Sequence, residues 1–182
     1  MIVVMGIDPG VAHTGFGVVR VAGGSMSAID GGVIEAPADE RPEGRLERIH
    51  RQLVELIAWH EPQAVALEDL YFGKNVRSAM AVGQARGVAM LAAAERGVSC
   101  FDYTPQAVKM AVCGTGSAAK KQVQRMVGML LGLPGPPQSD HAADALAVAI
   151  CHASQAAPAR AVQVAQAGQG LAGSLRPEAE AG

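Results

Sequence analysis

Residues 2–35 read IVVMGIDPGVAHTGFGVVRVAGGSMSAIDGGVIE, and this stretch decides the class of the fold. It contains three apolar segments separated by turn residues, namely 2–8, 15–21 and 26–35. Short apolar runs bounded by Gly, Pro and Asp are typical of β-strands. Because the connections between the segments are short, we expect the three strands to pair as an antiparallel meander.

The chain then alternates helical patterns with short apolar runs. Apolar residues recur with helical spacing after Pro42, and Glu61-Pro62 ends that helix. The run AVALED at 64–69 is typical of a central strand covered on both faces. A helix is expected over 78–96, and VSCFDY at 98–103 predicts a fifth strand.

Hydroxyl side chains mark the expected starts of three more helices. Thr104 stands before Pro105, Ser117 precedes a segment that runs to Leu131, and Ser139 precedes one that runs to about Ser154. A Ser or Thr oxygen at the N-cap accepts a hydrogen bond from a free amide of the first turn, and Pro suits the first helical position.

These elements predict an α/β fold with a mixed five-stranded sheet and helices on both of its faces. Three antiparallel strands come first, and the later strands add in parallel. Residues 1–154 are expected to form one domain, because about 150 residues suit one hydrophobic core. The stretch 155–182 is rich in Ala, Gly, Gln and Pro without an apolar period, so we expect a flexible tail there.

The composition is typical of a globular protein: of 182 residues, 49% are apolar and 18% are charged. The three cysteines are odd in number and form no Cys-x-x-Cys pair, which favours reduced thiols. The first residues lack the basic region of a signal peptide, and no apolar run reaches about 18 residues. We therefore expect a cytoplasmic protein without a membrane segment.

Charge is distributed unevenly along the chain. Residues 1–70 contain 11 acidic and 5 basic side chains, a net charge of −6, whereas residues 71–125 contain 8 basic and 2 acidic ones, a net charge of +6. This asymmetry has two interpretations. It fits an ordinary solvated surface, and it equally fits a groove that follows DNA phosphates beside an acidic site.

Acidic residues occur at three places where the local structure does not require them. Asp8 ends an apolar strand, Glu68 ends another, and Asp140, His141 and Asp144 stand at the start of an apolar helix. Each has a structural explanation on its own, as a turn residue, a solvated strand end or a charge favoured by the helix dipole. Together they predict a cluster of carboxylates, which only bound cations make stable.

A carboxylate cluster beside basic residues suits hydrolysis of a phosphodiester. Oxygen ligands favour hard divalent ions. In a pair of such ions, one lowers the pKa of the attacking water and the other stabilises the leaving oxygen. A basic segment then supplies contacts to the phosphates of a nucleic acid.

Five blocks of the sequence resemble, in order, the signature blocks of the RuvC family of Holliday junction resolvases. They are GIDPGVAHTGFGVV (6–19), ALEDLYFGKN (66–75), GQARGVAM (83–90), VKMAVCGTGSAAKKQV (108–123) and DHAADALAVAI (140–150). The resemblance implies a ribonuclease H-like fold and a divalent-metal-dependent endodeoxyribonuclease. It also implies that the enzyme resolves four-way junctions by symmetric cleavage in recombination and repair.

The same resemblance implies a set of catalytic, metal-binding residues: Asp8, Glu68, His141 and Asp144. One position on the last helix is Asp in some members of the family and falls on His141 here, with the neighbouring Asp140 as the less favoured alternative. The implied cofactor is a pair of divalent cations per subunit, Mg²⁺ or Mn²⁺. An imidazole ligand favours Mn²⁺ over Mg²⁺.

The resemblance further implies contacts with the junction. Lys109 and Lys120 match the family's active-site lysines, and Tyr71 matches an aromatic residue that stacks on exposed bases, with Phe72 as the alternative. The basic segment adds further candidates for DNA binding, namely Lys74, Arg77 and Lys121. The implied partners are a second copy of the chain and the RuvA–RuvB branch-migration complex. The small-residue helix within 78–94 is a candidate dimer face, and core packing is the alternative.

Two other classes of protein share part of this pattern. Phosphotransferases of the actin and sugar-kinase type also begin with a Gly-Ile-Asp strand end, but they need a second phosphate loop that this shorter chain lacks. A non-catalytic junction-binding protein would have a degenerate site. The presence of Asp8, Glu68 and Asp144 argues against that class, and a cleavage assay with divalent metal separates the two.

Overall fold

The computed structural model of the 182-residue chain describes residues 1–69 and 76–155. Nine labelled elements follow one another along the chain: β1 (Ile2–Asp8), β2 (His13–Ala22), β3 (Ser25–Glu35), α1 (Pro42–His60), β4 (Ala64–Glu68), α2 (Val76–Glu95), β5 (Cys100–Tyr103), α3 (Pro105–Cys113) and α4 (Lys120–Leu130). A further helix covers residues 140–155. The predicted tail from residue 156 onward lies outside the described residues.

The strands form one five-stranded sheet in the order β3-β2-β1-β4-β5. β2 pairs antiparallel with both β1 and β3, whereas β4 pairs parallel with both β1 and β5. The predicted α/β class, with a meander followed by parallel strands, is therefore confirmed. The parallel pairing brings the carboxyl ends of β1 and β4 to the same edge of the sheet.

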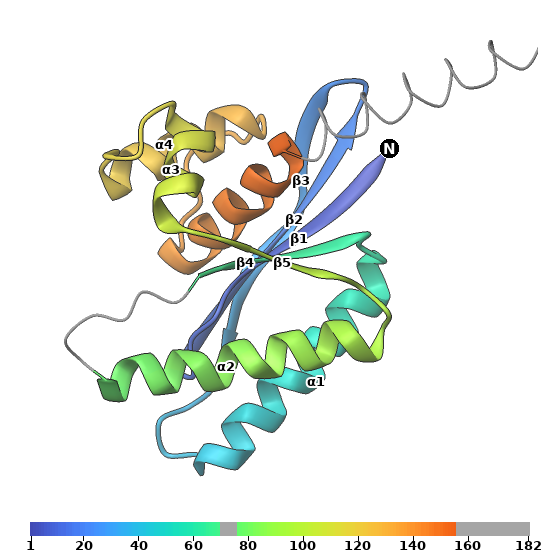
Figure 1. Cartoon of the computed structure of the whole chain (residues 1–182), viewed down its shortest axis with the longest axis vertical. Helices are drawn as coiled ribbons and strands as arrows, with labels where there is room; N and C mark the ends of the chain where they lie inside the picture. The colour runs from blue at the N-terminus through green and yellow to red at the C-terminus, as the bar shows by residue number, and fades with distance from the viewer. Residues whose placement is uncertain (70–75, 156–182) are drawn as a thin grey trace, which may run out of the picture.

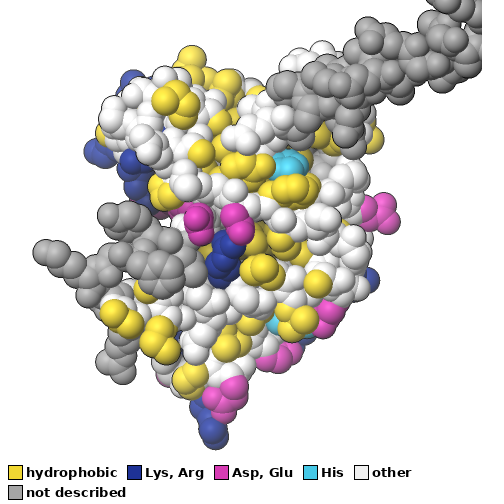
Figure 2. All heavy atoms as spheres, viewed as in Figure 1, with side chains coloured by type: hydrophobic (Ala, Val, Ile, Leu, Met, Phe, Trp, Pro, Cys, Tyr) yellow, Lys and Arg dark blue, Asp and Glu magenta, His cyan; other side chains and the backbone are white. Residues whose placement is uncertain are grey.

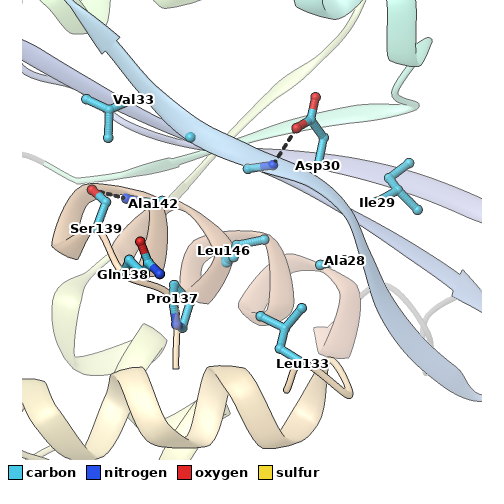
Figure 3. Close-up of a pocket in the computed structure, with 12 residues that line it drawn as sticks. Ala28, Ile29, Asp30, Val33, Leu133, Pro137, Gln138, Ser139, Ala142 and Leu146 are labelled. Atoms are coloured by element: carbon cyan, nitrogen blue, oxygen red, sulfur yellow. Dashed lines mark hydrogen bonds between the residues drawn. The ribbon is translucent and has the colours of Figure 1, made fainter. Parts of the chain in front are cut away.

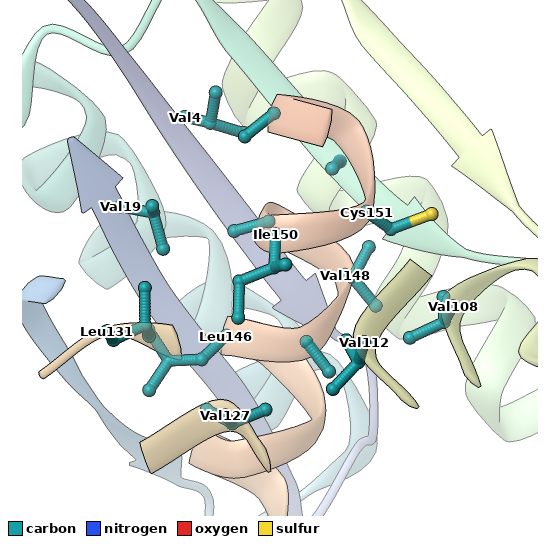
Figure 4. Packing of buried hydrophobic residues seen from close by; sticks show 14 of the residues in the cluster. Val4, Val19, Val108, Val112, Val127, Leu131, Leu146, Val148, Ile150 and Cys151 are labelled. Carbon is teal, nitrogen blue, oxygen red and sulfur yellow. The ribbon is translucent and has the colours of Figure 1, made fainter. Parts of the chain in front are cut away.

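Helices cover both faces of the sheet (Figure 1). α1 and α2 lie on one face, while α3, α4 and the 140–155 helix lie on the other. β1 supplies both cores, because Val4 joins the cluster under the 140–155 helix whereas Met5 and Ile7 join the cluster under α1 and α2. Figure 4 shows the first of these clusters, with Leu146 and Ile150 of the 140–155 helix inside it.

Glycines let the 140–155 helix lie directly on the sheet. A Cβ atom added at Gly6 of β1 would collide with the main-chain carbonyl of Ala145, and one at Gly15 of β2 would collide with that of His141. These main-chain neighbours cannot rotate away as a flexible side chain can. The close approach fixes the helix start against the ends of β1 and β2.

We expect Gly6→Ala to destabilise the protein. The added methyl group pushes the 140–155 helix off β1, and overpacking of this kind costs about 3 kcal/mol in the free energy of unfolding. Urea unfolding followed by circular dichroism measures the loss. The matched control is Gly87→Ala on α2, where a Cβ meets nothing within 4 Å. That change should stabilise the helix slightly, and equal stability of Gly6→Ala and wild type would contradict the close packing.

Two of the three predicted helix caps are confirmed. The Thr104 hydroxyl accepts a hydrogen bond from the amide of Ala107 at 3.2 Å, and the Ser139 hydroxyl accepts one from Ala142 at 3.4 Å. The prediction for Ser117 is wrong: α4 begins at Lys120 with Ala119 as its N-cap, which makes no side-chain hydrogen bond. The Ser117 hydroxyl instead lies 3.0 Å from that of Thr115, so the two side chains satisfy each other within the preceding turn.

The small residues of α2 face the core. Ala85, Ala89, Ala92 and Ala93 are fully buried, which supports core packing for that side of the helix. The opposite side carries exposed apolar side chains, with Met80 66% and Leu91 53% exposed. Among residues 1–69 and 76–155, no helix is long and apolar enough to span a membrane.

Candidate active site

Two of the predicted acidic residues end neighbouring parallel strands. Asp8 is the last residue of β1, and Glu68 is the last residue of β4. Asp8 lies an even number of residues from Val4 in β1, and Glu68 lies two residues from Ala66 in β4. Val4 and Ala66 both pack under the 140–155 helix. Since alternate side chains of a strand leave on the same face, both carboxylates leave the sheet on the face that carries this helix.

The start of the 140–155 helix meets these strand ends. His141 Nδ1 lies 2.8 Å from the Asp8 Oδ2 atom, so the imidazole and the carboxylate form a direct hydrogen bond. Asp144 stands one turn further along the same helix. The structure therefore brings residues from β1, β4 and the 140–155 helix to one edge of the sheet, as the sequence predicted.

The charges of neighbouring carboxylates affect the pKa values of Asp8 and Glu68. Burial raises the pKa of Asp8, and the nearby Asp144 charge raises it further, against the hydrogen bond from His141. Burial also raises the pKa of Glu68 to about 7, with further increases from the charges of Asp8 and Asp144. Like charges held this close destabilise one another unless cations lie between them.

Lys120 supplies one of the positive charges in this cluster. Its ammonium nitrogen lies 3.1 Å from Asp144 Oδ2 and 3.2 Å from Asp140 Oδ2. Burial lowers the pKa of Lys120, but its bonds with Asp144 and Asp140 raise the pKa more, so the net change is upward. Lys109 acts at longer range, and its charge opposes the rise in the pKa of Glu68.

The two alternatives at the helix start have different surroundings. His141 contacts Asp8, whereas Asp140 is bonded to Lys120 and to the side-chain amide of Gln124, both on α4. The hydrogen bond from Lys120, followed by that from Gln124, lowers the pKa of Asp140. Asp140 thus points toward α4, and His141 points toward the end of β1.

The donor set fits a hard divalent cation in its chemistry. Asp8, Glu68 and Asp144 provide carboxylate oxygens, and His141 adds an imidazole nitrogen. Within the described part of the chain, no three His, Cys, Asp or Glu side chains stand together as a ready-made metal site. Asp144 is paired with Lys120, and Asp8 is paired with His141.

The predicted DNA contacts are only partly described. Tyr71, Phe72 and Lys74 lie outside the described residues, and the side chain of Arg77 on α2 is likewise not described. Lys120 and Lys121 are both exposed at the start of α4. Basic side chains gather on the side of the molecule where α3 and α4 lie (Figure 2).

The structure adds three residues that sequence reasoning did not connect with the site. The ring of His13 stacks on that of His141, with 5.6 Å between the ring centroids and 10° between the planes. Gln124 bonds Asp140. Arg86, on α2, donates a hydrogen bond to the main-chain oxygen of Glu68. His13 and Arg86 lie inside the quoted blocks 6–19 and 83–90 but were assigned no role there, and Gln124 lies just outside the block 108–123.

A cavity of about 500 Å³ lies beside the helix start (Figure 3). Its walls come from β3, from the loop that contains Leu133 and Pro137, and from Ala142 and Leu146 of the 140–155 helix. None of the predicted catalytic residues lines it. The carboxylate cluster is therefore separate from this cavity.

Comparisons with known proteins agree with this geometry. A family model described as crossover junction endodeoxyribonuclease RuvC matches residues 4–152. Proteins of that name from Pelotomaculum thermopropionicum and Moorella thermoacetica are 50% and 51% identical over 150 and 151 residues, which cover 82% and 83% of this chain and 92% and 90% of theirs.

Solved structures give the same result. The structure of Thermus thermophilus RuvC matches with a TM-score of 0.81 at 41% identity, over 86% of this chain and 96% of that one. Its complex with a Holliday junction substrate matches with a TM-score of 0.82 at 41% identity, over 86% and 95% of the two chains. The yeast mitochondrial Holliday junction resolvase Ydc2 shares the fold, with a TM-score of 0.59 at 12% identity over 81% and 77% of the chains.

Proposed function

The chain belongs to the RuvC family of crossover junction endodeoxyribonucleases, and from that premise we propose that it resolves four-way (Holliday) DNA junctions by metal-dependent phosphodiester hydrolysis. The observation that carries this proposal is that Asp8 and Glu68 end neighbouring parallel strands, and that Asp8 is hydrogen-bonded to His141, one helical turn before Asp144. The nuclease domain would be residues 1–154, with 155–182 as a flexible tail.

The proposed catalytic residues are Asp8, Glu68, His141 and Asp144, which would together hold two divalent cations, Mg²⁺ or Mn²⁺. When bound, the ions would supply Lewis acidity at the scissile phosphate. In this proposal the chain would supply the three carboxylates, and the bond to Asp8 would orient the His141 ring. If Asp144 binds a cation, the ion pair between Lys120 and Asp144 would break, and the Lys120 ammonium group could then bind a DNA phosphate.

Contacts with DNA are proposed for the basic side chains near the cluster. The charges of Lys109 and Lys120 lower the pKa of Glu68, so both would favour a phosphate anion near that carboxylate. Lys121 is exposed beside Lys120. Tyr71 or Phe72 would stack on an exposed base, and Lys74 and Arg77 would contact the backbone, as the family resemblance implies.

The proposed assembly is a homodimer that places two identical sites on the two-fold symmetric junction. Cleavage of two strands of like polarity would then yield nicked duplexes. The RuvA–RuvB complex is the proposed partner and the cytoplasm the proposed location. A symmetric substrate is most simply cut by a symmetric enzyme.

Product analysis tests the function against the alternative of a junction-binding protein without activity. A synthetic four-way junction is incubated with the protein and Mn²⁺, and the products are treated with DNA ligase. We expect two nicked duplexes whose 5′-phosphates DNA ligase seals. A junction that is bound but stays intact with Mg²⁺ and with Mn²⁺ would support the non-catalytic class instead.

Substitution of Lys109 should weaken junction binding in a salt-dependent way. Each phosphate contact that is lost lowers the slope of log affinity against log salt by about 0.9. We therefore expect Lys109→Ala to reduce the slope by about that amount in titrations at several salt concentrations. The matched control is Arg20→Ala, because Arg20 is exposed and pairs in register with Val3 at the other end of β1. Equal slopes for Lys109→Ala and wild type would remove Lys109 from the DNA interface.

A further inference from the structure

Arg86 joins α2 to the ends of two strands from the far side of the sheet. Its Nη1 atom donates to the main-chain oxygen of Glu68 at 3.1 Å, and its Nη2 atom pairs with Asp102 Oδ1 of β5 at 2.5 Å. The Arg86 side chain is only 11% exposed, whereas that of Asp102 is 50% exposed. One guanidinium thus ties the last residue of β4 to β5 and to α2.

The two faces of β4 contact different parts of the protein near Glu68. Glu68 alternates with Leu67, which packs under α1 and α2. The Glu68 carboxylate leaves on the opposite face, toward Asp8 and Asp144. Arg86 approaches from the α2 face, together with Asp102, which pairs in register with Leu67. Arg86 bonds the main-chain oxygen of Glu68 and the side chain of Asp102, and does not bond the Glu68 carboxylate. Arg86 therefore acts on the position of Glu68.

Position matters at Glu68 because the ladder ends there. The register between β4 and β5 stops at the pair Glu68 and Tyr103, and the next amide, that of Asp69, donates to the Tyr103 carbonyl at 2.8 Å. That bond holds the N–H end of the peptide between Glu68 and Asp69, and Arg86 holds its carbonyl end. A planar guanidinium with two separated donors fixes the direction of both of its partners.

We propose that Arg86 is a positioning residue for Glu68, which holds the peptide plane from which this carboxylate enters the cluster with Asp8 and Asp144. This inference rests on the proposed function, since it assigns Glu68 to the metal site. Productive sites hold their groups within about 0.5 Å, so a loosened strand end weakens the metal site even while the fold persists.

A purely structural role predicts a different set of measurements. An ion pair between the buried Arg86 and the half-exposed Asp102 stabilises α2 against the sheet whether or not Glu68 binds metal. The chain offers a matched pair without the site: His60 of α1, 9% exposed, lies 2.8 Å from Asp30 of β3, which is 40% exposed. Like Asp102, Asp30 lies on an edge strand and binds a buried side chain of a helix.

The experiment compares Arg86→Met, Arg86→Lys, Asp102→Asn and the control Asp30→Asn in the full-length chain. Mn²⁺ binding without DNA is titrated by the electron paramagnetic resonance signal of the free ion. Urea unfolding reports stability, and gel shift in EDTA reports junction affinity. Wild type gives the reference for full Mn²⁺ affinity, and Glu68→Gln gives the reference for a site that lacks this carboxylate.

We expect Arg86→Met to weaken Mn²⁺ binding about 10- to 100-fold, the range found for groups that orient metal ligands. Arg86→Lys should recover part of the affinity, Asp102→Asn should show a smaller loss, and junction affinity in EDTA should stay within about twofold. Asp30→Asn should lower stability and leave Mn²⁺ binding unchanged. Because Asp102→Asn and Arg86→Lys keep most of the packing, they decide the matter even where Arg86→Met fails to fold.

Wild-type Mn²⁺ affinity in Asp102→Asn and both Arg86 variants, with stability lost as in Asp30→Asn, would overturn the proposal. A wild-type protein that binds Mn²⁺ through Glu68 but leaves junctions intact would remove the proposed function. The Mn²⁺ titration would still decide the role of Arg86 in that case. Unchanged Mn²⁺ binding in Glu68→Gln would overturn the positioning role directly.

Discussion

Asp8→Asn, Glu68→Gln and Asp144→Asn should each abolish junction cleavage while junction binding stays equal or becomes stronger. Each change removes one of the anionic oxygens proposed to hold the cations. We expect the cleavage rate to fall by more than about 100-fold, because even residues that only orient a metal ligand cost up to about 100-fold when they are replaced. It also removes a negative charge that repels DNA phosphate. Cleavage is measured at saturating protein with Mn²⁺, and binding is measured in EDTA.

The neutral amides also relieve the repulsion within the cluster. Burial and the neighbouring carboxylates raise the pKa values of Asp8 and Glu68, so removal of one charge stabilises the remaining two. We therefore expect the three variants to stay folded, which urea unfolding followed by circular dichroism checks. Glu55→Gln on the exposed side of α1 is the matched control and should cleave normally. Near-normal cleavage by any of the three variants would take that residue out of the cluster.

The second large effect concerns the metal that the site prefers. Mg²⁺ favours oxygen ligands and releases water reluctantly, whereas imidazole suits transition metals better. Because His141 contacts Asp8 directly, the wild type should cleave faster with Mn²⁺ than with Mg²⁺ at equal concentration. His141→Asp replaces the nitrogen by an oxygen ligand and should shift the ratio of the two rates about tenfold toward Mg²⁺, a change of about 1.4 kcal/mol.

Asp140→Ala is the control for this prediction. Asp140 is bonded to Lys120 and Gln124 on α4, so its loss should change the rates with the two metals in equal proportion. The measurement is initial cleavage rate for the wild type and both variants across Mg²⁺ and Mn²⁺ concentrations. An inactive Asp140→Ala beside a His141→Asp with wild-type metal preference would exchange the roles of the two residues.

The order of strands and helices could be predicted because the sequence pattern of each segment indicates whether that segment forms a strand or a helix. Alternation, apolar runs and turn residues predicted β1 to β3 and the buried β4, and the structure confirms them. Helix starts were predicted less well. Ser117 has the right side chain for an N-cap but bonds the neighbouring Thr115, and α4 begins at Lys120. A hydroxyl near a helix start can choose between partners, and the sequence does not reveal which one is closer.

The positions of Asp8 and Glu68 at strand ends could also be predicted, because a charge that ends an apolar strand is visible in the sequence. The supporting residues could not. Arg86 reaches Glu68 and Asp102 only because α2 packs across β4 and β5. His13 meets His141 only because Gly15 lets the 140–155 helix approach β2. Such contacts depend on how elements pack, which no local pattern contains.

The most direct test of the central claim is the rate of cleavage of a synthetic four-way junction, compared with a linear duplex of the same sequence, as divalent metal is titrated. We expect paired cuts in the junction that appear only with Mg²⁺ or Mn²⁺, and no cleavage of the duplex under the same conditions. Cleavage that persists in EDTA, or cleavage of junction and duplex at equal rates with metal present, would contradict a metal-dependent junction resolvase.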